Sequence, residues 1–470
     1  MVFSSIEFLF LFLPVCMILF FAAPGSTFKK VVLLLMSMLF YAWGEREYTV
    51  VMLASIGITW FFGLKIEAAE EGKRKKLLTA GVIINLGLLL YFKFGNFIVD
   101  NFNVLTSDLG PKFHAKVHHI HLPIGISFFT FQAISYLIDI YRQDVKAQKK
   151  LWVFAMYKSF FPQLIAGPIV RYRDIAGQIE HFKVKWEDFS EGAERFVIGL
   201  CQKVLIANTL GHVADEVFSL PASQQSTLFS WIGIISYTLQ IYFDFAGYSS
   251  MAIGLGRMFG LKFLENFNFP YTSKSITEFW RRWHISLSSW FRDYLYIPLG
   301  GNRGSQARTL SNLMIVFVLC GLWHGASWTF FIWGLFHGII LVIERQYLLK
   351  ILKKIPQSLA GIYTILMVML GWVFFRADTL ANALHFIKTM FVFQSVENPK
   401  FTMGNLITNE YIFFLILGLL FSSSTVISKF EKNPNAVLTS LRFGALTVGL
   451  VLSLISLSAN NFNPFIYFRF

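Results

Sequence analysis

One part of the chain reads FWRRWHISLSSWFRDYLYIPLGGNR over residues 279–303 and GLWHGASWTFFIWGLFHG over residues 321–338, with an apolar segment between. The first stretch contains His284 and the second contains His324. Ionisable side chains at membrane depth are costly and therefore indicate a functional site. Imidazole is also the side chain best suited to proton transfer near neutral pH. We therefore predict that both histidines are catalytic, with a packed structural histidine as the alternative at position 284.

The composition around this segment is that of a membrane protein. The chain has 470 residues, of which 55% are hydrophobic and 14% are charged, and its mean hydropathy is +0.56. A soluble domain carries about one quarter charged residues. The apolar runs are about 17–23 residues long, enough to cross about 30 Å of hydrocarbon as helix. We expect an all-α polytopic membrane protein that forms a single membrane-embedded domain over residues 1–470.

Twelve segments are long and apolar enough to be membrane-spanning helices. They are residues 5–23, 30–44, 48–64, 77–99, 122–141, 196–212, 228–260, 309–323, 327–344, 358–375, 410–427 and 441–458. A further apolar segment, residues 151–170, lies between basic loops on both sides and contains Pro162, Gly167 and Pro168. Prolines interrupt helices, and irregular backbone at depth survives only inside protein. This segment is therefore predicted to be re-entrant.

The chain is strongly basic, with 41 Lys and Arg against 27 Asp and Glu and a net charge of +14. In a soluble protein such a charge would indicate nucleic acid. Here the basic residues cluster in short loops, which predicts cytoplasmic loops and anionic lipid headgroups as partners, and no nucleic acid. The loop from Lys65 to Lys76 and the segment from Arg142 to Lys150 should be cytoplasmic.

Metal binding has weak support in the sequence. The three cysteines are scattered among apolar runs, which gives neither a disulfide framework nor a zinc site. Four histidines, His114, His118, His119 and His121, form HAKVHHIH in a loop that should be external. Their spacing could hold a metal, but no cysteine lies near them. We expect no metal site.

The stretch around His284 has the pattern of one amphipathic helix over residues 276–298. Its aromatic residues recur at three- and four-residue steps on one face, at Trp280, Trp283, Trp290 and Tyr294. Such a helix is expected at the membrane interface, with its aromatic side chains at headgroup depth.

His324 lies between two apolar spans, where Gly321 and Gly325 would let the backbone turn and a substrate approach closely. A buried imidazole there should be neutral and able to accept a proton. Trp323 is expected to support it. His337 is too far along the next helix to reach His324 and is interpreted as a packing residue.

Asp244, in the motif IYFDFAGYSS, is the main acid within an apolar span. It could orient a histidine or a water, or bond to Tyr242 or Tyr248.

Seven motifs together resemble the membrane-bound O-acyltransferase (MBOAT) family, in particular its branch that acetylates alginate and peptidoglycan. They are MVFSSIEFLFLFLPV, LPIGISFFTFQAISYLIDIYR, FFPQLIAGPIVRYRDI, IYFDFAGYSSMAIGLG, ENFNFPYTSKSITEFWRRWHISLSSWFRDYLYIPLGGNR, GLWHGASWTFFIWGLFHG and NPFIYFRF. The resemblance implies a ring of about 11–12 tilted transmembrane helices, with re-entrant segments and a central tunnel. His324 matches the family's catalytic position and His284 its second histidine.

The resemblance also implies the reaction. Acetyl groups would move from cytosolic acetyl-CoA, a substrate rather than a bound cofactor, across the bacterial inner membrane to an envelope polysaccharide. Because the chain ends at NPFIYFRF, a separate periplasmic SGNH-type acetyltransferase is the expected partner. The immediate acceptor is left open between a serine of that partner and a sugar hydroxyl. The alternative within the class is D-alanyl transfer from a carrier protein, and the alternative outside it is a transporter or exporter.

Coenzyme A carries several phosphate charges, and arginine binds phosphate with two hydrogen bonds at once. Four arginines near the GGNRG turn are therefore predicted to bind the donor: Arg281, Arg282, Arg292 and Arg303. Lipid headgroups are the competing partner for the same side chains.

Overall fold

The computed structural model describes residues 1–109, 115, 119–165, 167–396, 403–424, 436–459, 462–464 and 466. The chain divides into two compact units: unit 1 is Met1–Gly192 with Leu255–Leu264, and unit 2 is Ala193–Gly254 with Glu265–Phe470. Throughout the described residues the secondary structure is helical and no strand occurs, which confirms the all-α prediction. The prediction of a single domain remains a prediction.

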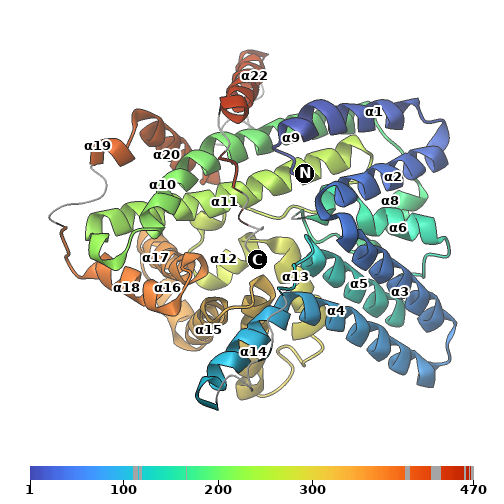
Figure 1. Ribbon diagram of the computed structural model, residues 1–470, viewed down its shortest axis with the longest axis horizontal. Coiled ribbons are helices and arrows are strands. Elements are labelled where there is room, and N and C mark those ends of the chain that lie inside the picture. The colour runs from blue at the N-terminus through green and yellow to red at the C-terminus, as the bar shows by residue number, and fades with distance from the viewer. Residues whose placement is uncertain are drawn as a thin grey trace. The chain divides into compact units, whose positions relative to one another are not determined.

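Unit 1 begins with a π-helical turn η1 (Phe8–Phe12) that continues into α1 (Leu13–Ala22). Its other elements are α2 (Gly25–Glu45), η2 (Arg46–Tyr48), α3 (Thr49–Ala68), α4 (Glu71–Leu105), η3 (Ser107–Leu109), α5 (Ile126–Tyr141), α6 (Leu151–Ser159), α7 (Phe161–Leu164), α8 (Tyr172–Glu180) and the start of α9 (Trp186–Cys201). Helices α3, α4 and α5 pack against one another (Figure 1).

Unit 2 contains the end of α9, η5 (Gln202–Ala207), α10 (Asn208–Phe218), η6 (Ala222–Gln224) and α11 (Thr227–Met258), whose last turn belongs to unit 1. Next come η7 (Pro270–Thr272), α12 (Ile276–Arg282), α13 (Ile285–Phe291), η8 (Arg292–Tyr296), α14 (Gln306–His324), α15 (Trp328–Ile343), η9 (Glu344–Leu348) and α16 (Leu349–Leu352). The unit ends with α17 (Gln357–Arg376), α18 (Leu380–Phe391), α19 (Met403–Leu406), α20 (Asn409–Phe421) and α22 (Ala436–Ala459).

Each of the twelve predicted spans falls mainly on a helix of the structure. Seven helical stretches in the described residues are long and apolar enough to cross a membrane, and three shorter apolar helices accompany them: Phe8–Ala22, Ile126–Tyr141 and Asn409–Phe421. The chain is therefore a multi-pass membrane protein. The ring, the tunnel and the number of crossings remain predictions.

The segment predicted to be re-entrant is interrupted as expected. Helix α6 has nine residues, about 14 Å of rise, and is too short to cross the hydrocarbon. It ends at Phe160, and α7 adds only four residues, with Pro162 in its first turn. Most side chains of both helices are buried, so this irregular backbone lies within protein, where its polar groups can be satisfied.

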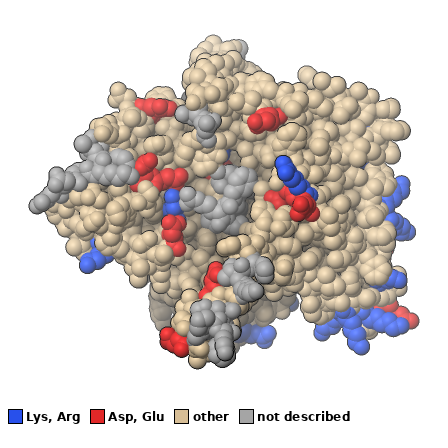
Figure 2. Space-filling model, viewed as in Figure 1, with Lys and Arg blue, Asp and Glu red and all other residues tan. Residues whose placement is uncertain are grey.

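Basic side chains of unit 1 gather where α3 meets α4 (Figure 2). Lys65, Lys73, Lys75 and Lys76 are exposed there. Arg74 is half-buried, because its guanidinium turns inward. It donates to the carbonyl oxygen of Ile66 at the C-terminal end of α3 and to that of Ile140 at the C-terminal end of α5, each at 3.2 Å. Cations are favoured at helix C-termini, so Arg74 caps the ends of both helices.

Close contact between α14 and α15 brings the site of unit 2 into position. A Cβ atom at Gly321 would collide with the carbonyl oxygen of Phe330, and one at Gly334 with that of Phe317. Small residues let membrane helices approach at backbone distance. The expectation that Gly321 makes room for a substrate is therefore wrong, since the next helix fills that space.

The predicted single helix over residues 276–298 is also wrong. The structure breaks it at His284, whose φ of 45° and ψ of 55° are left-handed, and separates α12 from α13. The cause is long-range pairing, because the amide of Ile285 donates to the carbonyl of Asn266 at 2.9 Å and that of Asn268 to the carbonyl of Arg282 at 2.9 Å. The predicted aromatic face does exist, but its side chains are buried in protein.

Candidate active site

His324 is the last residue of α14 and is buried among aromatic rings. Its ring centroid lies 4.9 Å from that of Trp323, 5.1 Å from Trp333 and 5.2 Å from Phe375. Phe330 adds a further ring, edge-on to Phe375 at 5.0 Å. These five side chains, from α14, α15 and α17, form what we call the aromatic pocket.

The turn that presents His324 is built by local capping. Helix α14 stops because Gly325 is extended, with φ −166° and ψ 150°. Helix α15 starts at Trp328 because the hydroxyl of Ser327 accepts a hydrogen bond from the amide of Phe330. A Cβ atom at Gly325 would collide with the ring of Phe330, so glycine is required there for close approach.

His284 lies in a set of hydrogen bonds instead. Its Nδ1 is 3.1 Å from Oδ1 of Asn266, and the hydroxyl of Ser286 donates to the same oxygen at 2.8 Å. The amide nitrogen of Asn266 donates to the hydroxyl of Ser249, on α11, at 3.0 Å. We call Ser249, Asn266, His284 and Ser286 the polar pocket. Each of the four is buried, and burial lowers the pKa of His284 below its ordinary value, so the imidazole is neutral.

Trp323 connects the two pockets. Its ring centroid lies 6.3 Å from that of His284 and 4.9 Å from that of His324. The structure thus brings the two predicted catalytic residues to the same indole, although they come from different parts of the chain. The prediction that Trp323 lies beside His324 follows from its place in the sequence. Its contact with His284 does not.

Asp244 contacts neither histidine. Its Oδ1 pairs with the ammonium of Lys203 at 2.8 Å, and both side chains are buried. Its Oδ2 accepts a hydrogen bond from the amide of Ile466 at 2.9 Å, and Lys203 also donates to the carbonyl of Pro464. The expected alternatives, a histidine, Tyr242 or Tyr248, are not its partners in the described residues. Asp244 instead anchors the C-terminal segment of the chain.

Glu344, at the end of α15, is a buried carboxylate that the sequence analysis did not single out. It accepts hydrogen bonds from the amide of Ile276 at 2.6 Å, and from the amide and hydroxyl of Thr277 at 2.8 and 2.7 Å. These donors form the first turn of α12, where a negative charge is favoured by the helix dipole. Glu344 therefore fixes the helix that leads into the polar pocket.

The four arginines predicted to bind the donor differ in their ion-pair and hydrogen-bond partners. Arg282 pairs with Glu278 at 2.8 Å, and Arg292 pairs with its neighbour Asp293 at 2.7 Å. Arg281 and Arg303 are exposed, and within the described residues no hydrogen bond or ion pair holds either side chain. None of the four is bonded to the two histidines, so their role in donor binding stays a prediction.

His337 packs as predicted. Its ring lies 5.2 Å from Trp280 and 5.1 Å from Trp333, and the indole nitrogen of Trp280 is 3.4 Å from its Nδ1.

Of the histidines in the loop predicted to be external, His114 and His118 lie outside the described residues. His121 pairs with the buried carboxylate of Glu45 at 3.2 Å. In the described part of the chain no group of three His, Cys, Asp or Glu is placed to hold a metal.

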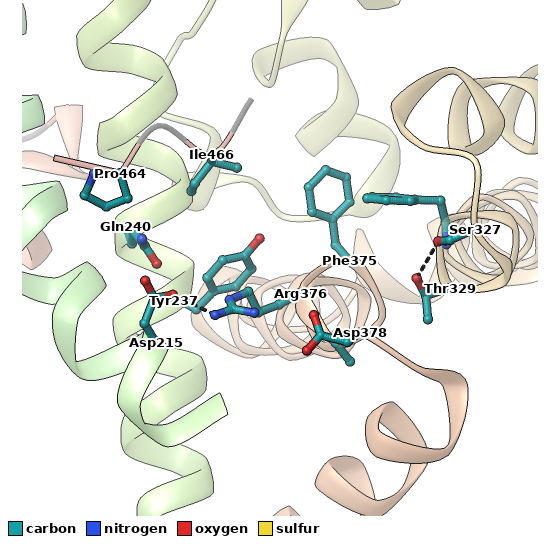
Figure 3. Close-up of a pocket in the computed structure, with 12 residues that line it drawn as sticks. Asp215, Tyr237, Gln240, Ser327, Thr329, Phe375, Arg376, Asp378, Pro464 and Ile466 are labelled. Atoms are coloured by element: carbon teal, nitrogen blue, oxygen red, sulfur yellow. Dashed lines mark hydrogen bonds and ion pairs between the residues drawn. The ribbon is translucent and has the colours of Figure 1, made fainter. Parts of the chain in front are cut away.

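A cavity of about 220 Å³ lies beside the aromatic pocket (Figure 3). Phe330 and Phe375 line it, and the ring of Phe375 also contacts that of His324, at 5.2 Å. Its polar wall carries Asp215, Arg376 and Asp378, and Arg376 pairs with Asp215 at 2.7 Å. Among the described residues, Ser327, Thr329, Tyr237, Gln240, Ala377, Pro464 and Ile466 also line it.

A multi-pass helical protein with two buried histidines and an adjoining polar cavity fits an enzyme that transfers an acyl group within a membrane. The chain belongs to the MBOAT, membrane-bound O-acyltransferase, family, whose sequence model matches residues 141–375. It is 42% identical to "Probable alginate O-acetylase AlgI" of Azotobacter vinelandii, with 100% of both chains covered. It is 39% identical to "Peptidoglycan O-acetyltransferase" of Helicobacter pylori, over 83% of this chain and 80% of the relative. "Teichoic acid D-alanyltransferase" of Bacillus subtilis is 32% identical over 49% of this chain and 61% of the relative.

The family assignment confirms the predicted class: the chain is a membrane-bound O-acyltransferase. The transporter alternative finds no support in these relatives. The sequence analysis missed Asn266, Glu344 and Lys203. The signal for Lys203 was available, since a cation inside the apolar span 196–212 indicates a buried partner. Asn266 lies in one of the motifs that carry the family resemblance, but no pattern of neighbouring residues indicated its contact with His284.

Proposed function

We propose that this protein moves acetyl groups from cytosolic acetyl-CoA to a hydroxyl on the extracytoplasmic side of the bacterial inner membrane, for O-acetylation of an envelope polysaccharide. The observation that carries the proposal is the position of His324, one aromatic ring away from a cavity lined by polar side chains. The acetylating activity named for the relatives from Azotobacter vinelandii and Helicobacter pylori supports the same reaction.

In this proposal His324 is the general base. The hydroxyl oxygen attacks the thioester carbonyl carbon while its proton passes to the imidazole of His324. The carbon–sulfur bond then breaks, and the proton is returned to the departing thiolate, which leaves as coenzyme A. A thioester is already activated, so positioning and proton transfer are the main tasks, and the base contributes about 10²–10⁴-fold. His284 assists from the other side of Trp323.

The donor phosphates bind near α12 and the GGNRG turn. Arg281 and Arg303 are the strongest candidates, because their guanidinium groups are exposed and uncommitted in the described residues. Arg282 and Arg292 already have acidic partners and contribute less. The four arginines share the cytoplasmic face with anionic lipid headgroups, as the basic loops require.

The charge of the cavity favours a neutral acceptor. Among the described lining residues, two carboxylates, Asp215 and Asp378, accompany one guanidinium, Arg376, which gives these residues a formal charge of −1. A polymer rich in carboxylates would be repelled from this wall, whereas a serine hydroxyl or a neutral sugar would not. The charge therefore favours a hydroxyl of a periplasmic SGNH-type partner, which passes the acetyl group to the polysaccharide, or a neutral sugar hydroxyl, over direct transfer to a carboxylate-rich polymer.

The test is acetyl transfer by the purified protein in proteoliposomes, with radiolabelled acetyl-CoA and periplasmic extract, followed by recovery of label in polysaccharide. His324→Ala should lower transfer by at least about 100-fold. His385→Ala is the matched control, because His385 lies on α18 outside the site and, within the described residues, its ring bonds to Thr389 on the same helix and to no other side chain. Normal transfer by a folded His324→Ala protein would refute the proposal.

A further inference from the structure

Asn266 holds the centre of the polar pocket, and the orientation of its amide can be read from its partners. The backbone nitrogen of Ser286 lies 3.2 Å from one end of that amide and can only donate. The atom at that end is therefore the oxygen, Oδ1. The other end, Nδ2, donates to the hydroxyl of Ser249 at 3.0 Å. Asn266 is 1% exposed, so water does not compete for these bonds.

The same oxygen faces His284. Nδ1 of His284 is 3.1 Å from Oδ1 of Asn266, and an acceptor oxygen pairs only with an N–H. The nearby hydroxyl of Ser286, 3.4 Å from Nδ1, already donates to Oδ1 at 2.8 Å and can only accept from the ring. Both contacts therefore place the proton on Nδ1. In a neutral imidazole the lone pair is then on Nε2.

Nε2 of His284 has no hydrogen-bond partner in the part of the chain that the structure describes, although it is buried. A buried acceptor without a partner costs free energy unless a ligand supplies a donor. The backbone is also held in the left-handed region at this residue, which is costly for a side chain with a Cβ. Such strain is common where a side chain must be aimed at a ligand.

We propose that Asn266 is a positioning residue that holds His284 as the Nδ1–H tautomer, so that Nε2 accepts a hydrogen bond from a substrate. This inference rests on the proposed function for the identity of the substrate. The donor to Nε2 is an O–H or N–H group: either the acceptor hydroxyl or an amide of the pantetheine arm of acetyl-CoA. Among the described residues, the side chains in contact with the ring of His284 are Phe245 of α11, Trp323 of α14, Asn266 and Ser286, and none of them is charged.

The direct test is nitrogen NMR of the protein labelled with ¹⁵N-histidine in detergent, with the His284 signals assigned by their loss in His284→Gln. The expected result is a protonated Nδ1 and an unprotonated Nε2. In Asn266→Leu the two tautomers should interconvert. A protonated Nε2 in the wild-type protein would overturn the inference. This measurement needs no activity, so its failure is distinct from failure of the proposed function.

The kinetic test uses Asn266→Asp, which keeps the shape of the amide. A carboxylate beside Nδ1 favours the imidazolium form and raises the pKa of His284, which protonates Nε2. The acid limb of kcat should therefore move to higher pH by about one pH unit or more. The shift should vanish in the Asn266→Asp/His284→Gln double variant. An unshifted limb in Asn266→Asp would contradict the inference.

Two further variants separate the substrates. Asn266→Leu should lower kcat about tenfold if Nε2 meets the acceptor hydroxyl, or raise KM for acetyl-CoA about tenfold if it meets the pantetheine amide. Ser249→Ala is the matched control, because it removes a polar contact of Asn266 and leaves the contact with His284 in place. Equal effects of Asn266→Leu and Ser249→Ala would reduce Asn266 to a structural residue and overturn the proposal.

Discussion

The two histidines of the site are held by opposite means. His324 is surrounded by the rings of the aromatic pocket, whose positions come from the packing of α14, α15 and α17. His284 is held by hydrogen bonds of the polar pocket, where Asn266 and His284 lie between helices and Ser286 is on α13. Packing fixes where a ring lies, whereas a hydrogen bond also fixes which nitrogen carries the proton. We therefore predict that the rings of the aromatic pocket govern stability, and that the hydrogen bonds of the polar pocket govern which nitrogen of His284 carries the proton.

The largest effect on stability should come from the aromatic pocket. Trp333 is fully buried and touches His324, Phe375 and Trp372. Trp333→Ala leaves a cavity, and removal of a buried aromatic side chain costs about 3–5 kcal/mol. We expect a clear fall in the thermal unfolding temperature in detergent. Trp328→Ala, at an exposed tryptophan on the same helix, is the control and should unfold like the wild type. Equal unfolding temperatures of the two variants would contradict the prediction that the aromatic pocket governs stability.

A smaller effect should follow from loosening the helix that leads into the polar pocket. Glu344→Gln keeps one acceptor oxygen but loses the charge that three donors of α12 share, at a cost of about 1–3 kcal/mol. Acetyl transfer should fall more than stability does, because α12 positions His284. Tyr363→Phe is the control, since it removes only the weaker 3.3 Å contact to Glu344. If both variants transfer acetyl groups alike, α12 is not fixed through this carboxylate.

The smallest effect should distinguish the arginines predicted to bind the donor. Arg281→Ala and Arg303→Ala should raise KM for acetyl-CoA by about threefold with little change in kcat, since exposed charges interact weakly. The increase should shrink at high salt. Arg292→Ala should change KM less, because Asp293 already neutralises that guanidinium. A larger effect at Arg292 than at the other two would show that the ion pair opens to admit the donor.

The sequence predicts some parts of this architecture well. Apolar runs of sufficient length place the spans, because the membrane imposes helical backbone on them. The interruption after residue 159 follows from Pro162, and the turn after His324 from Gly325. Each of these features is determined by residues within a few positions of the feature itself.

What the sequence could not predict depends on partners far along the chain. The helical period through residues 276–298 is intact, yet the backbone of Asn266 pairs with Ile285 and breaks the helix at His284. The sequence allowed Asp244 to orient a histidine, but its carboxylate pairs with Lys203 and accepts a hydrogen bond from the amide of Ile466. A local sequence pattern carries no information on these competing contacts, because each of them forms between segments that are far apart in the chain.

The tryptophans around the site have an optical consequence. Ring centroids lie 5.6 Å apart for Trp280 and Trp333, 6.3 Å for Trp333 and Trp372, and 5.0 Å for Trp372 and Trp283. At such separations, ultraviolet excitation absorbed by one indole passes readily to its neighbours, so the four rings emit as a coupled group. His324 and His337 each contact this group through Trp333, at 5.1 Å, and a protonated imidazole quenches indole emission. The protein therefore carries its own fluorescent reporter of the charge on these two histidines, without any added dye.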